Sequence, residues 1–363
     1  MSTHQTLAPY DAVVLLSFGG PEASAQVKPF LRSVTAGRDI PEARLYEVAQ
    51  HYEHFGGRSP IGAETRALLA NLQAALQARD LDAPVLLANR HLAPSVLQTL
   101  READGRGLHR LVTILTSAYP SYSSCRQYRE DLATGWEQAR AEGIVVGIDK
   151  LAPYAGSLAF RLPQRRLVIE ALRSFDVPDE RLTVLFVTHS VPETMDQLSG
   201  PGDGEGHRYR QEHVAVVDDV MASVQSALGR APASELVFCS RSGPAGQAWL
   251  EPDINDRLRE LAAAGGEGVV VVPIGFVSDH MEVVYDLDTE AAATADEVGL
   301  RMVRVPTVGR SAEFAAGLVD LLLARAAEAR GEHGQPSAGL PAVCAAGCCP
   351  NLRANRAALC GRD

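Results

Sequence analysis

The sequence predicts an α/β protein of two similar lobes, each built on a parallel sheet, with a cleft between them. Short apolar, β-branched runs alternate with longer segments of helical periodicity, which is typical of parallel sheets covered by helices. These runs divide into two comparable halves. Two runs in the second half end at small and polar residues, and a histidine or carboxylate follows. Because ligands of open α/β sheets bind at the carboxyl ends of strands, these two ends are candidate sites.

The apolar runs and the segments of helical periodicity predict where the individual strands and helices lie. Strands are expected at residues 12–17, 85–88, 111–116, 145–151, 182–188, 236–240, 268–274 and 301–305. Helices are expected at 64–79, 94–103, 126–142, 158–174, 213–228, 252–264, 281–298 and 312–329. The expected domain order is an N-terminal tail at 1–10, a first lobe at 11–156, a connecting helix at 157–181, a second lobe at 182–329 and a cysteine-containing extension at 330–363.

The composition excludes several classes of protein. The chain has 363 residues and a net charge of −11, and this negative charge argues against nucleic-acid binding. No apolar run approaches the roughly 20 residues of a membrane span. The polar first ten residues lack the layout of a signal peptide, so we expect a cytoplasmic location. Six cysteines in that compartment are expected to be free thiols or metal ligands rather than disulfides.

His189 stands at the first of the two strand ends. It closes a buried-looking strand, and Ser190 and Pro192 follow it. Most single histidines are structural or surface residues, so a structural role is the alternative. At a strand end before a proline-restricted loop, an imidazole can accept a proton near neutral pH or ligate a metal. We therefore take His189 as a candidate catalytic and metal-binding residue.

His280 and three carboxylates form the second group. If a helix begins just before Glu282, then Glu282, Asp286 and Glu290 share one helical face. A solvated acidic face is the alternative, although like charges at this spacing destabilise an isolated helix. The functional interpretation is a relay of oxygen ligands that passes a cation inward to His189. His280, Glu282 and Asp286 are thus candidate metal ligands, and Glu282 is the second candidate catalytic residue.

Two glycines follow the first strand, in the segment Phe18-Gly19-Gly20. The nucleotide-binding patterns G-x-G-x-x-G and G-x-x-x-x-G-K-[ST] are both missing. We therefore predict a tight turn that shapes a pocket, with Phe18 as a candidate substrate contact, and not a nucleotide site.

Thiols are concentrated in the C-terminal extension, which carries Cys344, Cys348, Cys349 and Cys360. The C-x2-C pairs of zinc fingers are missing, and four crowded thiols fit an iron–sulfur or another thiolate site. A ligand from elsewhere is also possible, and Cys125 in a polar segment is the candidate. Cys239 lies within a predicted strand and is interpreted as a small buried hydrophobe.

Taken together, these residues resemble the ferrochelatase family, enzymes that insert ferrous iron into a porphyrin at the end of haem synthesis. The resemblance covers about residues 11–329. It is carried by six ordered motifs, which are Leu15-Leu16-Ser17-Phe18-Gly19-Gly20-Pro21, His54-Phe55-Gly56-Gly57-Arg58-Ser59-Pro60, Thr188-His189-Ser190-Val191-Pro192, Ser240-Arg241-Ser242-Gly243-Pro244, Trp249-Leu250-Glu251-Pro252-Asp253 and the run 273–288.

The resemblance implies two Rossmann-like, chelatase-type lobes that hold a porphyrin in their cleft. It also implies that His189 is the metal-site histidine and Glu282 its partner carboxylate. Ser59 and Tyr128 match positions of porphyrin contacts in the family. Ferrous iron is then a substrate of the reaction and not a resident cofactor.

Some family members carry a [2Fe–2S] cluster, held by one internal cysteine and three in a C-terminal extension. Cys125 matches the internal position, in a segment that resembles the actinobacterial branch. The tail spacing differs from the C-x2-C-x4-C of animal enzymes. We expect Cys344 to bind, and one of Cys348, Cys349 and Cys360 not to bind, because adjacent ligands would demand an unusual bend. Such a cluster would be structural, since metal insertion needs no redox step.

The actinobacterial resemblance implies that the substrate is coproporphyrin III, with protoporphyrin IX as the alternative. Two other functions stay open: a tetrapyrrole- or metal-binding protein without turnover, and a chelatase for cobalt or nickel. The expected partners are a porphyrin and ferrous iron, with no nucleic acid and no membrane span. Transient contacts with neighbouring enzymes of the haem pathway are a further expectation.

Overall fold

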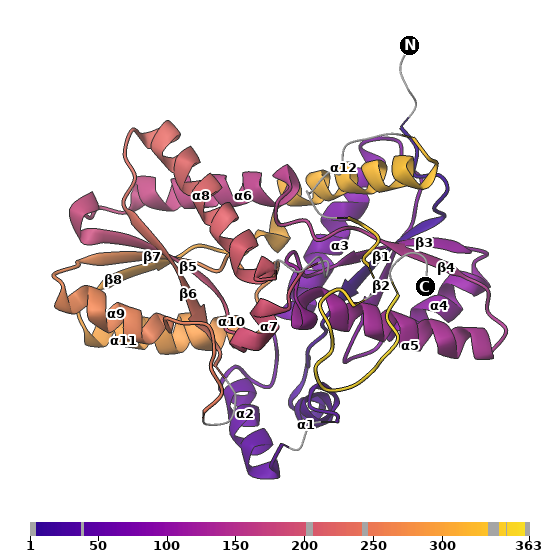
Figure 1. Cartoon of the computed structure of the whole chain (residues 1–363), viewed down its shortest axis with the longest axis horizontal. Helices are drawn as coiled ribbons and strands as arrows, with labels where there is room; N and C mark the ends of the chain where they lie inside the picture. The colour runs from indigo at the N-terminus through magenta and orange to yellow at the C-terminus, as the bar shows by residue number, and fades with distance from the viewer. Residues whose placement is uncertain are drawn as a thin grey trace.

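In the computed structural model, which describes residues 5–37, 40–200, 206–241, 246–332, 341–345 and 347–359, the chain forms two four-stranded parallel sheets. Figure 1 shows the two sheets side by side. The first has the order β2-β1-β3-β4, from β1 (Ala12–Ser17), β2 (Val85–Asn89), β3 (Arg110–Leu115) and β4 (Gly147–Lys150). The second has the order β6-β5-β7-β8, from β5 (Leu182–His189), β6 (Ala233–Cys239), β7 (Gly268–Val272) and β8 (Arg301–Arg304). The predicted fold class of two parallel α/β lobes is confirmed.

Helices cover these sheets. They are α1 (Ser24–Val34), α2 (Glu42–His54), α3 (Ile61–Gln77), α4 (Val96–Gly105), α5 (Gln127–Ala141), α6 (Leu158–Ser174), α7 (Glu193–Gln197), α8 (Arg208–Leu228), α9 (Ile254–Ala263), α10 (Met281–Tyr285), α11 (Ala292–Glu297) and α12 (Ala312–Ala329). None of these helices in the described ranges is both long and apolar enough to cross a membrane.

The structure differs from the prediction in several helical regions, among them α7, which was not predicted. Helices α1 and α2 were not predicted, because Pro29 interrupts the pattern of α1 and α2 is mostly polar. The single helix expected at 281–298 is instead α10, a π-helical segment Asp286–Ala291 and α11. A second π-helical segment, Tyr122–Arg126, precedes α5. Such turns close i to i+5 hydrogen bonds, which no residue pattern predicts.

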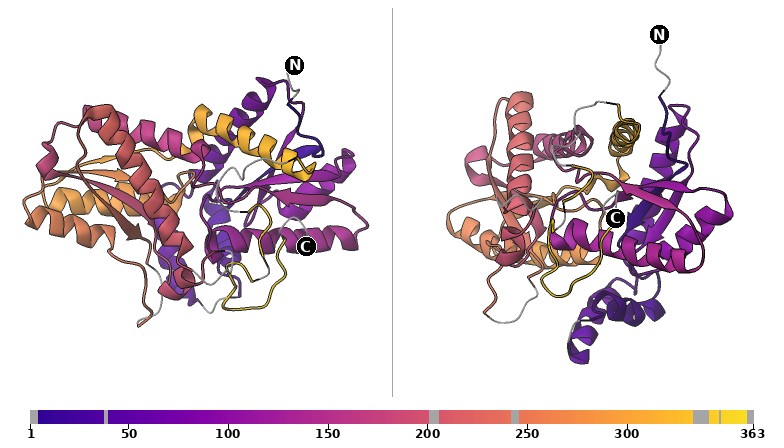
Figure 2. Two further views of the ribbon diagram at one scale, coloured as in Figure 1. Left: turned by 45° about the horizontal axis from the view of Figure 1, so that its top comes forward. Right: turned by 45° about the vertical axis from the view of Figure 1, so that its right-hand side comes forward.

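One apolar core runs through both lobes. It joins β1 residues such as Leu15 to β5 residues such as Phe186, through Phe160 of α6 and Phe314 of α12. Helix α12 packs against both α3 and α6, and α6 packs in turn against α8. Figures 1 and 2 show α6 and α12 along the same side of the two sheets, while α1 and α2 project on the other side. The two long helices therefore connect the lobes.

The C-terminal extension lies against the first lobe. In Figure 1 the yellow C-terminal segment passes across α5. The N–H of Leu359 donates to the carbonyl of Arg129 in α5 at 3.0 Å. Leu359, Cys348 and Cys349 are buried in the apolar cluster beneath the first sheet. The extension is thus part of the packed structure.

Gly317→Ala is expected to destabilise the contact between α12 and α6. A Cβ at Gly317 would lie 2.6 Å from the Cα of Ala159, and such overpacking costs about 1–3 kcal/mol. The matched control is Gly105→Ala at the end of α4, where a Cβ meets nothing within 4 Å and the change should stabilise by roughly 0.5–1 kcal/mol. Urea unfolding of both variants measures this. Equal stabilities would contradict the close helix contact.

Candidate active site

The carboxyl edges of the two sheets meet at Tyr119. This residue follows β3, and its hydroxyl donates to the carbonyl of Ile274, just after β7, at 3.2 Å. Its ring stacks on His213 of α8, with centroids 3.5 Å apart and planes at 9°. The strand ends of the two lobes are therefore held next to each other by a buried contact.

His189 is the last residue of β5, and its side chain is 34% exposed. Its Nε2 lies 3.0 Å from Oε1 of Glu282, and its Nδ1 donates to the carbonyl of Ser190. Both ring nitrogens thus face acceptors, as in a protonated imidazole. Burial lowers the pKa of His189, but the charge of Glu282 and the hydrogen bond with it outweigh burial and raise this pKa to about 9.

Glu282 lies in the first turn of α10, where the helix dipole favours a negative charge. Burial raises its pKa, but the charge of His189 and the hydrogen bond with it have the larger combined effect and lower the pKa to about 2. Its side chain is 42% exposed. The two predicted catalytic residues therefore form one ion pair that a ligand can reach.

Tyr209 of α8 fixes the backbone at this point. Its hydroxyl donates to the carbonyl of His189 at 2.9 Å and accepts from Oγ1 of Thr188 at 2.8 Å. Its own N–H donates to Oγ of Ser199 at 2.8 Å. The sequence analysis missed Tyr209, because nothing in its spacing relates a helical tyrosine to the end of β5.

His280 caps α10. Its Nδ1 accepts the N–H of Val283 at 3.4 Å, and burial lowers its pKa, which keeps the ring neutral. In this tautomer Nε2 carries the proton. Ligation of a metal through Nε2 would therefore require the ring to change tautomer and give up the cap.

Asp286 begins the π-helical segment after α10. The hydroxyl of Ser240 donates to its Oδ2. Burial and the neighbouring charge of Glu282 raise the pKa of Asp286 to about 7. Ser240 directly follows β6 and has a φ of 64°, a left-handed conformation that is uncommon outside glycine. Of the rest of its motif, residues 242–244 lie outside the described residues.

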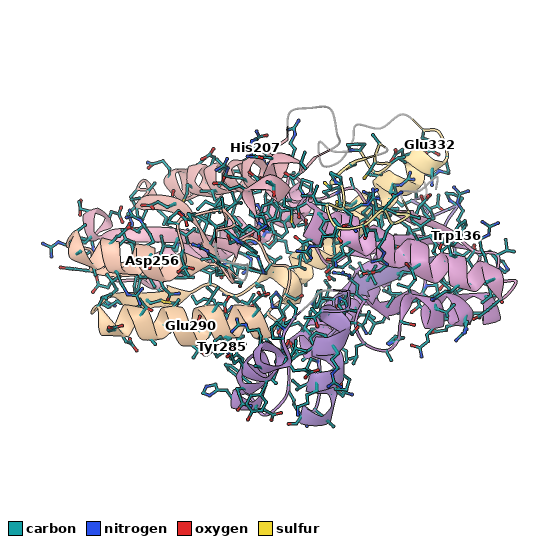
Figure 3. All side chains as sticks on the ribbon, turned by 60° about the horizontal axis from the view of Figure 1, so that its bottom comes forward. Trp136, His207, Asp256, Tyr285, Glu290 and Glu332 are labelled. Atoms are coloured by element: carbon teal, nitrogen blue, oxygen red, sulfur yellow. The ribbon has the colours of Figure 1, made fainter. Side chains whose placement is uncertain are left out.

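Glu290 extends this row of carboxylates to the surface. Burial and the charge of Asp253 raise its pKa, and the charge of Glu290 contributes to the raised pKa of Asp286. Figure 3 labels Glu290 and Tyr285 on this helical stretch. Exposure increases from the half-buried Glu282 and Asp286 to the exposed Glu290. The row therefore leads from the ion pair to solvent.

The unpredicted helices α1 and α2 cover the start of α10. Met281 is buried in an apolar cluster with Phe30 of α1 and Tyr52 of α2. His51 of α2 stacks on Tyr285, with centroids 3.7 Å apart. These two helices therefore form one wall around the ion pair.

Ser59 joins the first lobe to the same helix. It is buried, and its Oγ accepts the N–H of Met281 at 3.2 Å. The predicted porphyrin contact Ser59 therefore binds the residue that precedes Glu282 in the chain.

Phe18 and Tyr128 are brought together by Arg90. The guanidinium lies 5.2 Å from the centroid of Phe18 and 4.4 Å from that of Tyr128. Its Nε donates to Asp131 at 2.6 Å, and its side chain is 1% exposed. Arg90 was not predicted, although it directly follows β2 and so obeys the strand-end rule used for His189.

Comparison with known proteins identifies the family. The sequence profile of the ferrochelatase family matches residues 10–326. The chain belongs to the ferrochelatase family. The resemblance inferred from the sequence motifs is confirmed.

Relatives of this ferrochelatase match over nearly their whole length. The chain is 46% identical to the coproporphyrin III ferrochelatase of Leifsonia xyli, over 95% of this chain and 92% of the relative. It is also 46% identical to that of Streptomyces coelicolor, over 98% and 97%. Among solved structures, SirB from Bacillus subtilis with Fe3+ has a TM-score of 0.51 at 13% identity, covering 90% of this chain and 98% of SirB. That likeness shows the fold alone.

Four of the predicted cluster ligands lie together in this ferrochelatase. Cys125, Cys348 and Cys349 are buried in one apolar cluster, and Cys344 packs against it. The Sγ atoms of Cys348 and Cys349 are 3.9 Å apart. Cys349 has a φ of 50°, a left-handed conformation that is uncommon outside glycine. Cys360 lies outside the described residues.

The extension is also tied to the second lobe through Gly200. The N–H of Gly200 donates to Sγ of Cys349 at 3.2 Å, and the N–H of Cys349 donates to the carbonyl of Gly200 at 3.2 Å. The preceding residue, Ser199, is the one that binds Tyr209. The cysteine site and the His189 backbone are therefore held by adjacent residues.

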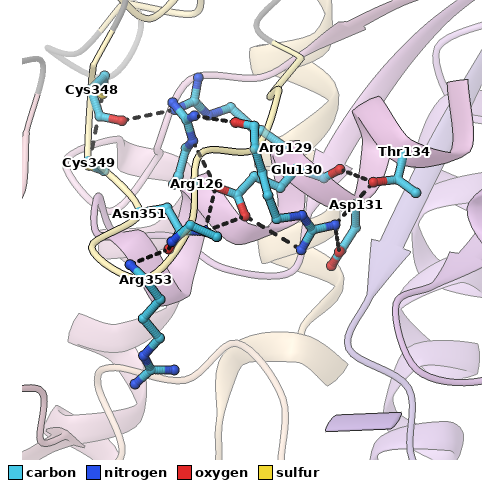
Figure 4. Close-up of polar contacts among 11 residues, drawn as sticks. Arg126, Arg129, Glu130, Asp131, Thr134, Cys348, Cys349, Asn351 and Arg353 are labelled. Carbon is cyan, nitrogen blue, oxygen red and sulfur yellow. Dashed lines mark hydrogen bonds and ion pairs between the residues drawn. The ribbon is translucent and has the colours of Figure 1, made fainter. Parts of the chain in front are cut away.

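Glu130 anchors the extension on α5. Its carboxylate is fully buried, and it accepts from Arg126 at 3.2 Å and from Nδ2 of Asn351 at 3.1 and 3.2 Å. Figure 4 shows this carboxylate among its partners, with Arg129 donating to the carbonyl of Cys348 nearby. A buried carboxylate needs such partners. The extension supplies one of them to the first lobe, because Asn351 donates to the carboxylate of Glu130.

His213→Phe is expected to make stability less sensitive to acid. Burial lowers the pKa of His213 to about 3, below the unfolded value of about 6.5. The unfolded chain therefore binds this proton more tightly, and the stability contributed by the neutral ring is present above pH 6.5 and lost as pH falls toward 3. Phenylalanine keeps the stacking on Tyr119 and cannot titrate.

Urea unfolding of both proteins at pH 7.5 and 5 checks this expectation. As the pH falls, the free energy of unfolding of the wild type should decrease by up to about 1.4 kcal/mol more per pH unit than that of the variant. Parallel losses in the two proteins would contradict it.

Proposed function

We propose that this protein is a coproporphyrin III ferrochelatase, a lyase that inserts Fe2+ into coproporphyrin III to give coproheme. The observation that carries the proposal is the partly exposed ion pair of His189 and Glu282 at the meeting strand ends. Curated relatives named coproporphyrin III ferrochelatase, 40–46% identical over nearly the whole chain, support the substrate.

Metal insertion requires two pyrrole protons to leave while a cation enters. His189 supplies an imidazole that can exchange its proton for the metal, since only a neutral imidazole is a ligand. Glu282 stays ionised and balances the positive charge beside it. Asp286, with a pKa of about 7, can accept and release a proton near neutral pH. Together with Glu290 it forms a row of oxygens that can conduct protons or the cation to and from solvent.

Strain in the porphyrin is the other requirement. A planar macrocycle hides its nitrogen lone pairs, so the site has to hold the ring bent and offset that strain by binding its periphery. Phe18, Tyr128 and Ser59 are the proposed contacts with the ring. His280 is proposed to lie beside the metal site. Its hydrogen bond with the N–H of Val283 disfavours direct ligation of the metal.

His189→Ala and Glu282→Ala are each expected to lower the rate of iron insertion about 10²–10⁴-fold, because the first removes the proposed metal ligand and the second removes the negative charge beside it. Porphyrin affinity should change little, since the ring is bound by other groups. Stopped-flow insertion and fluorescence titration measure the two quantities separately. The surface variants His109→Ala and Glu297→Ala are matched controls. Unchanged insertion in both site variants would contradict the assignment, and a wild type that binds without turnover would make the protein a carrier.

Coproporphyrin III should be preferred over protoporphyrin IX in anaerobic turnover with Fe2+. Protoporphyrin lacks two of the four propionates, and each lost hydrogen bond to a charged group costs about 1.5–3 kcal/mol. We therefore expect kcat/KM to be at least about tenfold higher for coproporphyrin III. An equal or higher kcat/KM for protoporphyrin IX would overturn the substrate proposal and leave the ferrochelatase proposal standing.

A [2Fe–2S] cluster is the proposed cofactor, with Cys125, Cys344, Cys348 and Cys349 as its ligands. Thiolate sulfur is the donor that such clusters take. Across the described residues, no group of three or more His, Cys, Asp or Glu is already arranged for a metal ion. The four thiols are nonetheless gathered, and the N–H of Gly200 donates to one sulfur. When bound, the cluster would link the cysteines of the extension to Cys125 of the first lobe.

Protein from an iron-replete culture is expected to be red-brown, with iron and sulfide bound. Cys125→Ser should abolish the visible absorption, because it removes the ligand from the first lobe. Cys360→Ser should retain it, and so should Cys239→Ser, a buried control at the end of β6. A colourless wild type without iron and sulfide would refute the cluster. A cytoplasmic location and transient contacts with neighbouring haem-pathway enzymes stay predictions.

A further inference from the structure

We infer that Lys150 is the counter-charge of the four-cysteine site, where its buried ammonium stabilises the negative charge of a bound iron–sulfur cluster and raises the reduction potential of that cluster. This inference rests on the proposed [2Fe–2S] cofactor and adds a residue outside the ligand set. Lys150 would act on the cluster through its charge and would not ligate iron.

Lys150 is buried without an opposite charge. It ends β4 and is 3% exposed. Its Nζ donates to the carbonyls of Ala342 at 2.7 Å and Leu151 at 3.3 Å. Within the described ranges no carboxylate forms an ion pair with it. An ammonium held by two neutral carbonyls is costly to bury, so an anionic occupant nearby would account for its position.

The adjacent carboxylate cannot fill that role. Asp149 precedes Lys150 in β4, and successive side chains of a strand point to opposite faces. Asp149 is bound on its own side by Arg325 at 3.3 Å and by the hydroxyl of Tyr10 at 2.6 Å. The charge of Lys150 therefore remains unbalanced on the face that carries the cysteines.

Lysine is also a rare residue in this chain. Of 34 lysines and arginines only two are lysines, and the other, Lys28 in α1, is exposed. The one buried lysine is thus found beside the thiols.

Lys150 and Cys125 share a dry environment. Both line one narrow gap between β3 and the segment after β4, and the gap has no room for a water molecule.

A cluster of ferric iron, sulfide and four thiolates is anionic, and one-electron reduction increases its negative charge by one. A buried positive charge stabilises both forms, and the reduced form more. Removal of that charge should therefore shift the one-electron equilibrium toward the oxidised cluster. The electron comes from the reductant in the assay, and no bond is formed or broken.

Lys150→Gln is the test, because glutamine keeps a donor for the Ala342 carbonyl and loses the charge. Potentiometric titration with dithionite, followed by electron paramagnetic resonance, measures the midpoint potential. We expect reduction to be at least tenfold less favourable than in the wild type, a shift of about −59 mV. Lys150→Arg should stay near the wild type, and Lys28→Gln is the exposed control. Iron and sulfide content and the melting temperature are measured on each variant.

The outcomes separate the possibilities. A wild-type potential in Lys150→Gln overturns the inference and leaves the cluster proposal intact, even if less cluster is retained, because a purely structural anchor would change occupancy and not potential. If Lys150→Gln assembles no cluster, loss of the cluster in Lys150→Arg as well would overturn the charge role, whereas retention in Lys150→Arg supports it. A wild type without iron and sulfide overturns the cluster and this inference together, while turnover of porphyrin still tests the enzyme.

Discussion

The ion pair between His189 and Glu282 is the interaction on which the rest of the candidate site depends. Each partner keeps the other charged, so the pKa of the imidazole rises and that of the carboxylate falls. A cation that ligates the imidazole has to displace its proton and take over the charge that stabilises Glu282. The pair therefore fits the proposed exchange between protons and a divalent cation. The row through Asp286 and Glu290 leads from the pair to solvent, as the proposed exchange requires.

Strand ends made much of this site predictable from the sequence. His189 directly follows the apolar residues of β5, and Glu282 lies in the first helix after β7, because parallel topology brings carboxyl ends to one edge. Arg90 and Ser240 follow β2 and β6 in the same way. They were overlooked because the rule was applied only to strands followed by an obvious proton donor or metal ligand.

Features that depend on contacts between distant segments could not be predicted. Tyr209 becomes important only because α8 brings its hydroxyl to the end of β5. The left-handed conformation of Cys349, which follows Cys348 in the chain, has no signal in the sequence. In the sequence Lys150 is an ordinary lysine at the end of a strand. In the structure the extension covers it, and the carbonyl of Ala342 accepts a hydrogen bond from its ammonium. In each case a second segment gives the residue its environment.

The cysteine site and the ion pair share one support, and this gives the extension a physical reason to be ordered. Ser199 binds Tyr209, which holds the carbonyl of His189, while Gly200 exchanges two hydrogen bonds with Cys349. Gly200 has a φ of 122°, and a Cβ there would lie 2.6 Å from Arg208. A side chain at this position would therefore require Arg208 to move. A movement of Cys349 would be passed through two adjacent residues to the backbone of His189, so the extension can influence the proposed metal site without contacting the porphyrin.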